Sequence, residues 1–372
     1  MVEVRLDDRL RLLSAMLLFT AQGSHQTHFA PHPIRIRTLE WLAPHSGHSS
    51  LRIFRRLAER VFISFFYSLG VQLGAAPDFA PPDEAVLEPD IMTHLERVAK
   101  DSGCSSTYLL NELSESMGDF YSAGRLPALW SATSAAWDSV RAGAVRAVDS
   151  CGLATWLKSF FGPVNFRLVV VPLATSPPSM GFGPRNSSEG YAIIGPNCVS
   201  RPGSEAGLWQ GLVRGRGEVV ASKTSKTWVE EPFDYALSFD ASTQTMMVHE
   251  FSHSLIREFF GRNPDLAHVT SAINAKLPLR GYFPNMYPEW PLRLEEIIVR
   301  AVQTLFQSDH GGEAAGRRAL EAQVSEFGLE VLPEVHRALA DYARAKKAGD
   351  YGNLSEFGPE LEKRLLAWAE KS

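Results

Sequence analysis

The chain carries, at residues 242–260, the stretch STQTMMVHEFSHSLIREFF. Within it, His249, Glu250 and His253 form an H-E-x-x-H motif, the pattern of the zinc-binding helix of metallopeptidases. Residues four apart on a helix share one face, so both histidines can reach one metal ion. Glu250 is offset by about 100° and can hydrogen-bond a water on that ion as a general base. The stretch therefore predicts a helix that carries part of a catalytic zinc site.

The sequence around the motif favours a helix. Asp240 or Ser242 can act as the N-cap, and Gly261 lies just beyond the expected end. A β-type segment at 235–239 precedes the motif, which resembles the strand-then-helix layout of zincins. The alternative is an ordinary amphipathic helix on which two histidines and a glutamate bind no metal.

A catalytic zinc ion needs a third protein ligand and an open fourth position. The metzincin pattern fails, because Ile256 and Phe259 stand where it requires Gly and His. A glutamate on a later helix is the remaining common solution, and residues 291–306 (PLRLEEIIVRAVQTLF) offer Glu295 and Glu296. The apolar stripe of this helix lies nearly opposite Glu296 and has Glu295 at its edge. Helical geometry alone leaves both candidates open.

Two segments resemble a bacterial family of gluzincin-like proteins that is described only as a domain of unknown function. They are HEFSHS at residues 249–254 and an E-x-x-V-R-A segment formed by Glu296, Val299, Arg300 and Ala301. The likeness extends more loosely from the amino-terminal helix to residues 351–368, so it covers most of the chain as one unit. It implies zinc binding and peptidase chemistry, with Glu296 as the third ligand. The family has no established substrate to carry over.

Further residues could take part in the chemistry. Arg300, one turn beyond Glu296, could orient the ligand carboxylate, bind substrate or form a structural salt bridge. Residues 281–290 (GYFPNMYPEW) form the expected loop between the two helices and contain Tyr282 and Tyr287. Peptide hydrolysis needs a hydrogen-bond donor for the developing oxyanion, and Tyr287 is the predicted donor. Aromatic residues beside prolines also serve packing, which is the alternative role.

The whole chain predicts a mostly helical α+β fold, zincin-like, with a small sheet before the H-E-x-x-H helix. We expect one unit, 1–372, with a helical part at 1–160, a catalytic core at 161–310 and C-terminal helices at 311–372. Apolar periodicity and β-branched runs place the elements. Helices are expected at 5–19, 50–73, 88–99, 107–117, 128–156, 242–260, 264–275, 290–308, 314–327, 331–347 and 358–370, and strands at 166–173, 191–194, 218–221 and 235–239.

Composition limits the partners. The 372 residues carry a net charge of -5, so nucleic acid is not an expected partner. The sequence has no uninterrupted apolar run of about 18 residues, which predicts no membrane span. Residues 12–19 (LLSAMLLF) imitate a secretion signal, but acidic residues precede them, so we expect a cytoplasmic protein, with secretion as the alternative. The three cysteines fit a reducing compartment.

A second metal site is not expected. Histidines gather near the amino terminus, but no cysteine or carboxylate lies close by, and Pro31 and Pro33 are expected to break a helix there. These histidines are His25, His28, His32, His45 and His48.

Zinc is therefore the expected cofactor, and a peptide or protein is the expected substrate. The alternative function is a non-catalytic helical binding or scaffold protein, stabilised by zinc in a vestigial peptidase site. The retained Glu250 argues against it, because a structural site has no water to activate.

Overall fold

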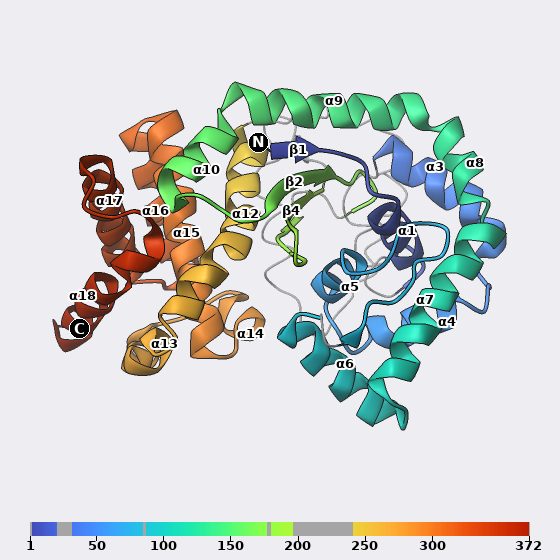
Figure 1. The fold of residues 1–372 in the computed structure, drawn as a ribbon, viewed down its shortest axis with the longest axis horizontal. Helices are drawn as coiled ribbons and strands as arrows, with labels where there is room; N and C mark the ends of the chain where they lie inside the picture. Colours follow the sequence, from blue (N-terminus) through green and yellow to red (C-terminus); the bar gives the residue numbers. More distant parts are fainter. Residues whose placement is uncertain (1, 21–31, 85–86, 177–179, 196–240, 372) are drawn as a thin grey trace, which may run out of the picture. The chain divides into compact units, whose positions relative to one another are not determined.

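The computed structural model describes residues 2–20, 32–84, 87–176, 180–195 and 241–371. The described chain forms two compact units. Unit 1 contains residues up to 147 together with 166–195 and 241–243, and unit 2 contains 148–165 and 244–371. Helices predominate in both units, and one small sheet lies in unit 1 (Figure 1). The expected class, α+β and mostly helical, is confirmed.

Four strands form the sheet of unit 1 in the order β1-β2-β4-β3. Strands β1, β2 and β4 are parallel to their neighbours, and β3 is antiparallel to β4. Strand β2 is buried along nearly its whole length and β4 along all of it, which fits the apolar runs at 168–171 and 191–194. The expected strands at 166–173 and 191–194 are confirmed, and those at 218–221 and 235–239 lie outside the described residues. The strands are β1 (Val2–Val4), β2 (Arg167–Pro172), β3 (Gly181–Phe182) and β4 (Glu189–Ile194).

The helices of unit 1 bury a core rich in Leu and Phe side chains against the sheet residues Val169 and Val171. Several expected helices differ in length. The span 50–73 is two helices interrupted at residues 59–62, and 128–156 is three shorter helices. The helices are α1 (Asp8–Leu17), α3 (Pro33–Leu42), α4 (Leu51–Ala58), α5 (Ile63–Gly70), α6 (Pro89–Ser102), α7 (Ser106–Ala123), α8 (Leu126–Ala132) and most of α9 (Ser134–Ser150).

One prediction about prolines was wrong. Pro33 does not break a helix but occupies the first turn of α3. Backbone N–H groups in the first turn have no acceptor within the helix, so a proline without an N–H is tolerated there. The preceding residue, His32, is buried, and its Nδ1 accepts a hydrogen bond from the Ile34 amide, 3.1 Å away. This histidine therefore caps a helix.

A partly buried ion pair joins the amino-terminal end of unit 1 to strand β4. Arg5, just after β1, donates two hydrogen bonds of 2.9 and 2.6 Å to the carboxylate of Glu189 at the start of β4. Tyr191 also donates to this carboxylate. Hydrogen bonding from Arg5, which outweighs burial, lowers the pKa of Glu189 to about 2. The pair fixes β1 to the sheet although 184 residues separate its members.

Unit 2 is built around α15, whose buried residues include seven consecutive positions from 296 to 302. Helices α16 and α17 pack against it, and the Tyr342 hydroxyl of α17 donates to the Phe160 carbonyl of α10, 2.7 Å away. The helices are α10 (Leu153–Phe161), α12 (Ala241–Arg262), α13 (Leu266–Val269), α14 (Phe283–Met286), α15 (Trp290–Gly311), α16 (Glu313–Phe327), α17 (Leu332–Ala348) and α18 (Gly358–Lys371).

This division does not follow the expected subregions 1–160, 161–310 and 311–372. Strands β2 and β4 group with the amino-terminal helices, whereas nearly all of α12 groups with the carboxy-terminal helices. The sheet and the H-E-x-x-H helix, which were expected together in a catalytic core, therefore fall in different units.

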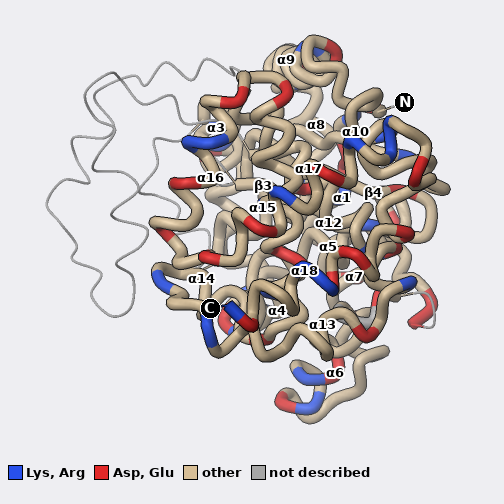
Figure 2. Tube along the Cα trace, turned by 90° about the vertical axis from the view of Figure 1, so that its left-hand side faces the viewer, with Lys and Arg blue, Asp and Glu red and all other residues tan. Residues whose placement is uncertain are grey.

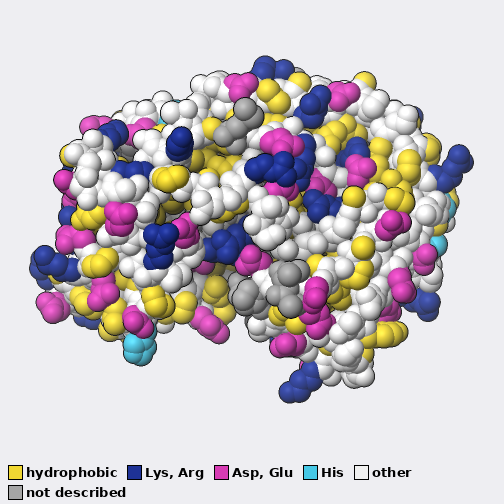
Figure 3. All heavy atoms as spheres, viewed as in Figure 1, with side chains coloured by type: hydrophobic (Ala, Val, Ile, Leu, Met, Phe, Trp, Pro, Cys, Tyr) yellow, Lys and Arg dark blue, Asp and Glu magenta, His cyan; other side chains and the backbone are white. Residues whose placement is uncertain are grey.

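Charged side chains of both signs are interspersed over the described chain. Lys and Arg alternate with Asp and Glu along the trace (Figure 2), and the face drawn in Figure 3 mixes basic, acidic and hydrophobic groups. Among the described residues, no helix has both the length and the apolar character needed to cross a membrane.

Candidate metal centre

The H-E-x-x-H motif lies on α12, which begins one residue before the expected helix 242–260 and ends two residues after it. One side of α12 is apolar and buried, and this fixes how far the helix is rotated and where its histidines point. The buried residues of this side are Met247, Val248, Phe251, Leu255, Ile256 and Phe259.

The expected ends of α12 need correction. Ser242 is the second residue of the helix, so it is not the N-cap, and Asp240 lies outside the described residues. Gly261 belongs to the last turn and does not follow the helix. The apolar periodicity placed the helix correctly, but residues that could act as caps did not mark its boundaries.

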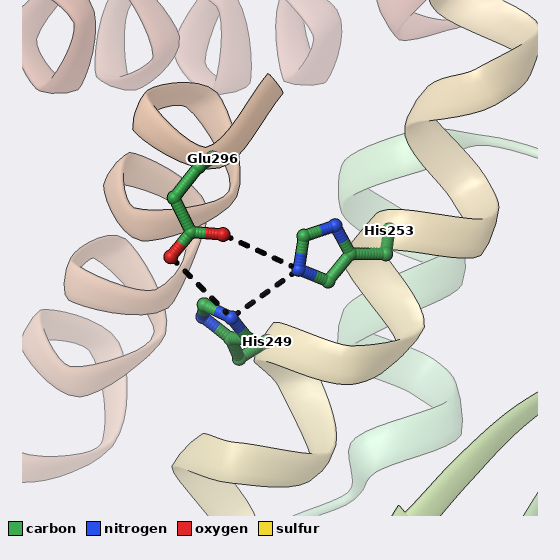
Figure 4. Close-up of side chains that lie close together, drawn as sticks. All are labelled: His249, His253 and Glu296. Carbon is green, nitrogen blue, oxygen red and sulfur yellow. Dashed lines mark hydrogen bonds and ion pairs between the residues drawn. The ribbon is translucent and has the colours of Figure 1, made fainter. Parts of the chain in front are cut away.

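His249 and His253 on α12 meet Glu296 on α15 (Figure 4). The two Nε2 atoms lie 3.3 Å apart, His253 Nε2 lies 3.4 Å from Glu296 Oε2, and His249 Nε2 lies 3.8 Å from Glu296 Oε1. Ligands of a tetrahedral zinc ion are about 3.3 Å apart, given bonds of about 2.0–2.1 Å. These three side chains could hold a metal ion, and they are the only such group among the described residues.

Each histidine is held from its other ring nitrogen. Nδ1 of His249 lies 3.0 Å from Gln303 Oε1, and Nδ1 of His253 lies 3.0 Å from Glu295 Oε1. An oxygen at this position requires a proton on Nδ1, which leaves the lone pair of a neutral ring on Nε2, directed at the centre. In its neutral form, each ring that donates from Nδ1 to this oxygen is the tautomer that can bind a metal through Nε2.

Glu296, and not Glu295, lies in the three-residue group. The Glu296 side chain is fully buried, whereas Glu295 is 26 % exposed and contacts the outer side of His253. The position of Glu296 opposite the apolar stripe would count against it only if α15 buried a single face. In the structure α15 is buried on both sides, so the face opposite its apolar stripe is also enclosed.

The carboxylate of Glu296 offers free lone pairs. Both oxygens are buried, and neither accepts a hydrogen bond from any described residue. A buried polar atom without a partner is costly, and a cation at the centre would satisfy these oxygens together with the histidine nitrogens. The donor set thus fits a divalent metal, with two imidazoles and one carboxylate as in catalytic zinc sites.

Arg300 lies behind Glu296, one helical turn further along α15. Its Nε is 2.6 Å from Glu296 Oε1, an ion-pair contact without the alignment of a hydrogen bond. Its other nitrogens donate to Gln323 of α16 and to the Tyr282 hydroxyl, the latter at 3.1 Å. Because Arg300 is only 6 % exposed, the structure favours the orienting role over direct substrate binding.

Charge is distributed unequally over the centre. Burial lowers the pKa of His249 to about 4, so this ring is neutral at pH 7. Burial acts in the same direction on His253, but Glu295 and Glu296 outweigh it and raise the pKa to about 10. Burial would raise the pKa of Glu296, yet Arg300 and the histidines outweigh it and hold that pKa below its ordinary value. A metal would therefore displace a proton from His253.

Glu250 stands beside this group without joining it. It is 7 % exposed, and burial raises the pKa of its carboxyl to about 8, a shift that His253 and Arg300 oppose. A carboxyl that titrates near neutral pH is suited to taking and returning a proton. Its role as a general base stays a prediction.

Tyr287 and Tyr282 flank α14, a single helical turn where a loop was expected. Both are half-buried. Tyr287 faces Glu296 closely enough that burial and this carboxylate raise the pKa of its phenol, so the hydroxyl keeps its proton. Tyr282 instead accepts a hydrogen bond from Arg300.

The sequence did not indicate Gln303 or Gln323, nor the contact of Glu295 with the outer ring nitrogen of His253. Gln303 follows Glu296 by seven residues, which is two turns of helix, so it returns to the same face. That spacing could have identified it. Gln323 comes from another helix, and no local pattern connects it to Arg300.

Of the other histidines, His48 accepts a hydrogen bond at Nδ1 from the Ser50 amide, 3.3 Å away, and His25 and His28 lie outside the described residues. Neither Cys104 nor Cys151 forms a disulfide with another described residue, and Cys198 also lies outside the described residues. No protein-family profile, curated protein or solved structure matches this chain.

Proposed function

We propose that the protein is a zinc-dependent hydrolase, a gluzincin-like metallopeptidase that cleaves peptide bonds. One observation carries the proposal: three ligand atoms of His249, His253 and Glu296 lie at metal-ligand spacing, and an oxygen lies 3.0 Å from the Nδ1 of each histidine. Two imidazoles and one carboxylate leave the fourth position for water and substrate. The histidine side chains are 16 and 21 % exposed, which is consistent with access to that position.

Zinc, when bound, would lower the pKa of a coordinated water toward about 7 and polarise the scissile carbonyl. Glu250 would take the proton of the attacking water and pass it to the leaving nitrogen. Tyr287 would donate a hydrogen bond to the carbonyl oxygen as negative charge develops on it. Arg300 would hold the carboxylate of Glu296 in place.

Metal content tests the site first. Elemental mass spectrometry of the purified protein should find about one zinc per chain, and none in His249→Ala or Glu296→Gln. Glu295→Gln should keep zinc with an affinity reduced about 10- to 100-fold, because it loses only the support of His253. Zinc absent from a folded wild type, after zinc is supplied, would refute the metal centre. Metal lost from Glu295→Gln but kept in Glu296→Gln would reverse the ligand assignment.

Cleavage of a mixed peptide library tests the activity. The zinc-loaded wild type should produce new peptide termini, and Glu250→Gln should retain zinc while its rate falls about 10²- to 10⁴-fold. Mass spectrometry of the products would also give the cleavage preference. Equal inactivity of two zinc-loaded proteins would favour the alternative, a binding or scaffold protein with a vestigial peptidase site.

A further inference from the structure

Arg300 has more contacts than an arginine that only completes a salt bridge. Its guanidinium lies over the rings of Phe327 and Phe283, with Cζ 4.8 and 5.6 Å from their centroids. Gln323 and Tyr282 accept hydrogen bonds from its terminal nitrogens. Residues of α16 and of the α14 turn therefore fix the guanidinium where its Nε meets Glu296.

The buried carboxylate of Glu296 needs a cation whether or not a metal is bound. An isolated carboxylate in a protein interior is strongly destabilising, and removal of one partner from a buried pair costs far more than loss of a surface pair. Arg300 supplies a fixed positive charge 2.6 Å from Oε1. The remaining oxygen, Oε2, is the one nearer His253 Nε2, at 3.4 Å.

We propose that Arg300 is a positioning residue that serves as a permanent counter-cation for Glu296, so that the centre is assembled before any metal binds. The inference deepens the proposed function and rests on it only for the role of the metal. It makes the centre unlike small zinc domains, whose ligands come together only when metal binds.

Thermal unfolding in EDTA tests the inference. Arg300→Gln should lower the Tm by on the order of 10 °C, because it removes the cation that lies 2.6 Å from a buried carboxylate. Arg364→Gln is the matched control: it removes ion pairs with Asp341 and Glu360 in the same unit, away from the centre, and should shift the Tm much less. Arg300→Lys, which keeps the charge, should recover part of the loss.

The second substitution in Glu296→Gln/Arg300→Gln should restore at least half of the Tm lost in Arg300→Gln, because it also removes the buried negative charge that Arg300 balanced. If Arg300→Gln does not fold in EDTA, a folded double variant supports the inference and an unfolded one overturns it. An Arg300→Gln variant as stable as Arg364→Gln would also overturn it.

Unfolding in the presence of zinc distinguishes a failure of this inference from a failure of the proposed function. Excess zinc should reduce the Tm difference between Arg300→Gln and the wild type, since the metal replaces the missing cation. If zinc stabilises the wild type but this difference stays unchanged, the inference is contradicted. If zinc binds neither protein, the metal centre fails, and the comparison in EDTA still decides the role of Arg300.

Discussion

Tyr287 has two possible roles, hydrogen-bond donation by its hydroxyl group and packing by its ring. Its phenol lies beside Glu296 and stays protonated, so it can donate a hydrogen bond to an oxyanion, but the ring also packs on Phe283 with centroids 4.9 Å apart. Tyr287→Phe keeps the ring and removes only the donor. We expect zinc content and stability to be unchanged and kcat on a cleaved peptide to fall about 10²- to 10³-fold.

Tyr282→Phe is the comparison, since the Tyr282 hydroxyl accepts a hydrogen bond from Arg300. This substitution should lower stability more than kcat. Unchanged turnover in Tyr287→Phe would leave its ring with a packing role.

Residue types and their spacing predicted the centre of the site, and they predicted its surroundings less well. The spacing of His249, Glu250 and His253 is a property of one helix, so it can be read from the sequence alone. The choice between Glu295 and Glu296 depended on which sides of α15 are covered, and that depends on the packing of α12, α16 and α17. The acceptors of the two histidines were missed because a glutamine or a glutamate on a helix is usually solvated.

At the scale of elements, apolar periodicity found most helices but not their interruptions. Residues 59–62 separate α4 from α5 inside a stretch whose apolar pattern is nearly continuous. Strand β1 was missed because three residues, Val2–Val4, carry no pattern of their own. It forms by pairing with Leu168, Val169 and Val170, which lie far along the chain. Pairing partners so distant in sequence cannot be inferred from local composition.

The Arg5–Glu189 pair that holds β1 gives a prediction about pH. The pKa of Glu189 is lowered from 4.5 to about 2, chiefly by the hydrogen bond from Arg5 and further by Tyr191 and Arg167. These partners therefore contribute stability that is fully present above about pH 4.5. The contribution is lost as the pH falls toward 2. Glu189→Gln should therefore lower the free energy of unfolding at pH 7 and make it less dependent on pH between 5 and 3, as measured by urea unfolding. Glu334→Gln removes a more exposed carboxylate and should leave the wild-type pH dependence unchanged; the same slope in all three proteins would contradict the assignment.

At the scale of the whole molecule, the two units cut across the order of the sequence. Residues 148–165 join unit 2 although the segments on either side of them belong to unit 1. Composition changes along the chain suggested three consecutive subregions, because composition reports what a segment is made of and not which segments pack together. The absence of any matching family or structure leaves the chemistry of the centre to be argued from its own residues.

Helix α15 supplies the proposed carboxylate ligand, its arginine partner and the oxygens behind both histidines, all between residues 295 and 303. The residues of the centre thus lie in two short sequence motifs, H-E-x-x-H at 249–253 and E-E-x-x-x-R-x-x-Q at 295–303. Inserting one residue between Glu296 and Gln303 would turn the later positions by about 100° and separate the ligand from its supports. Any unrelated chain that carries both motifs at helical register becomes a candidate for the same centre, whatever surrounds it.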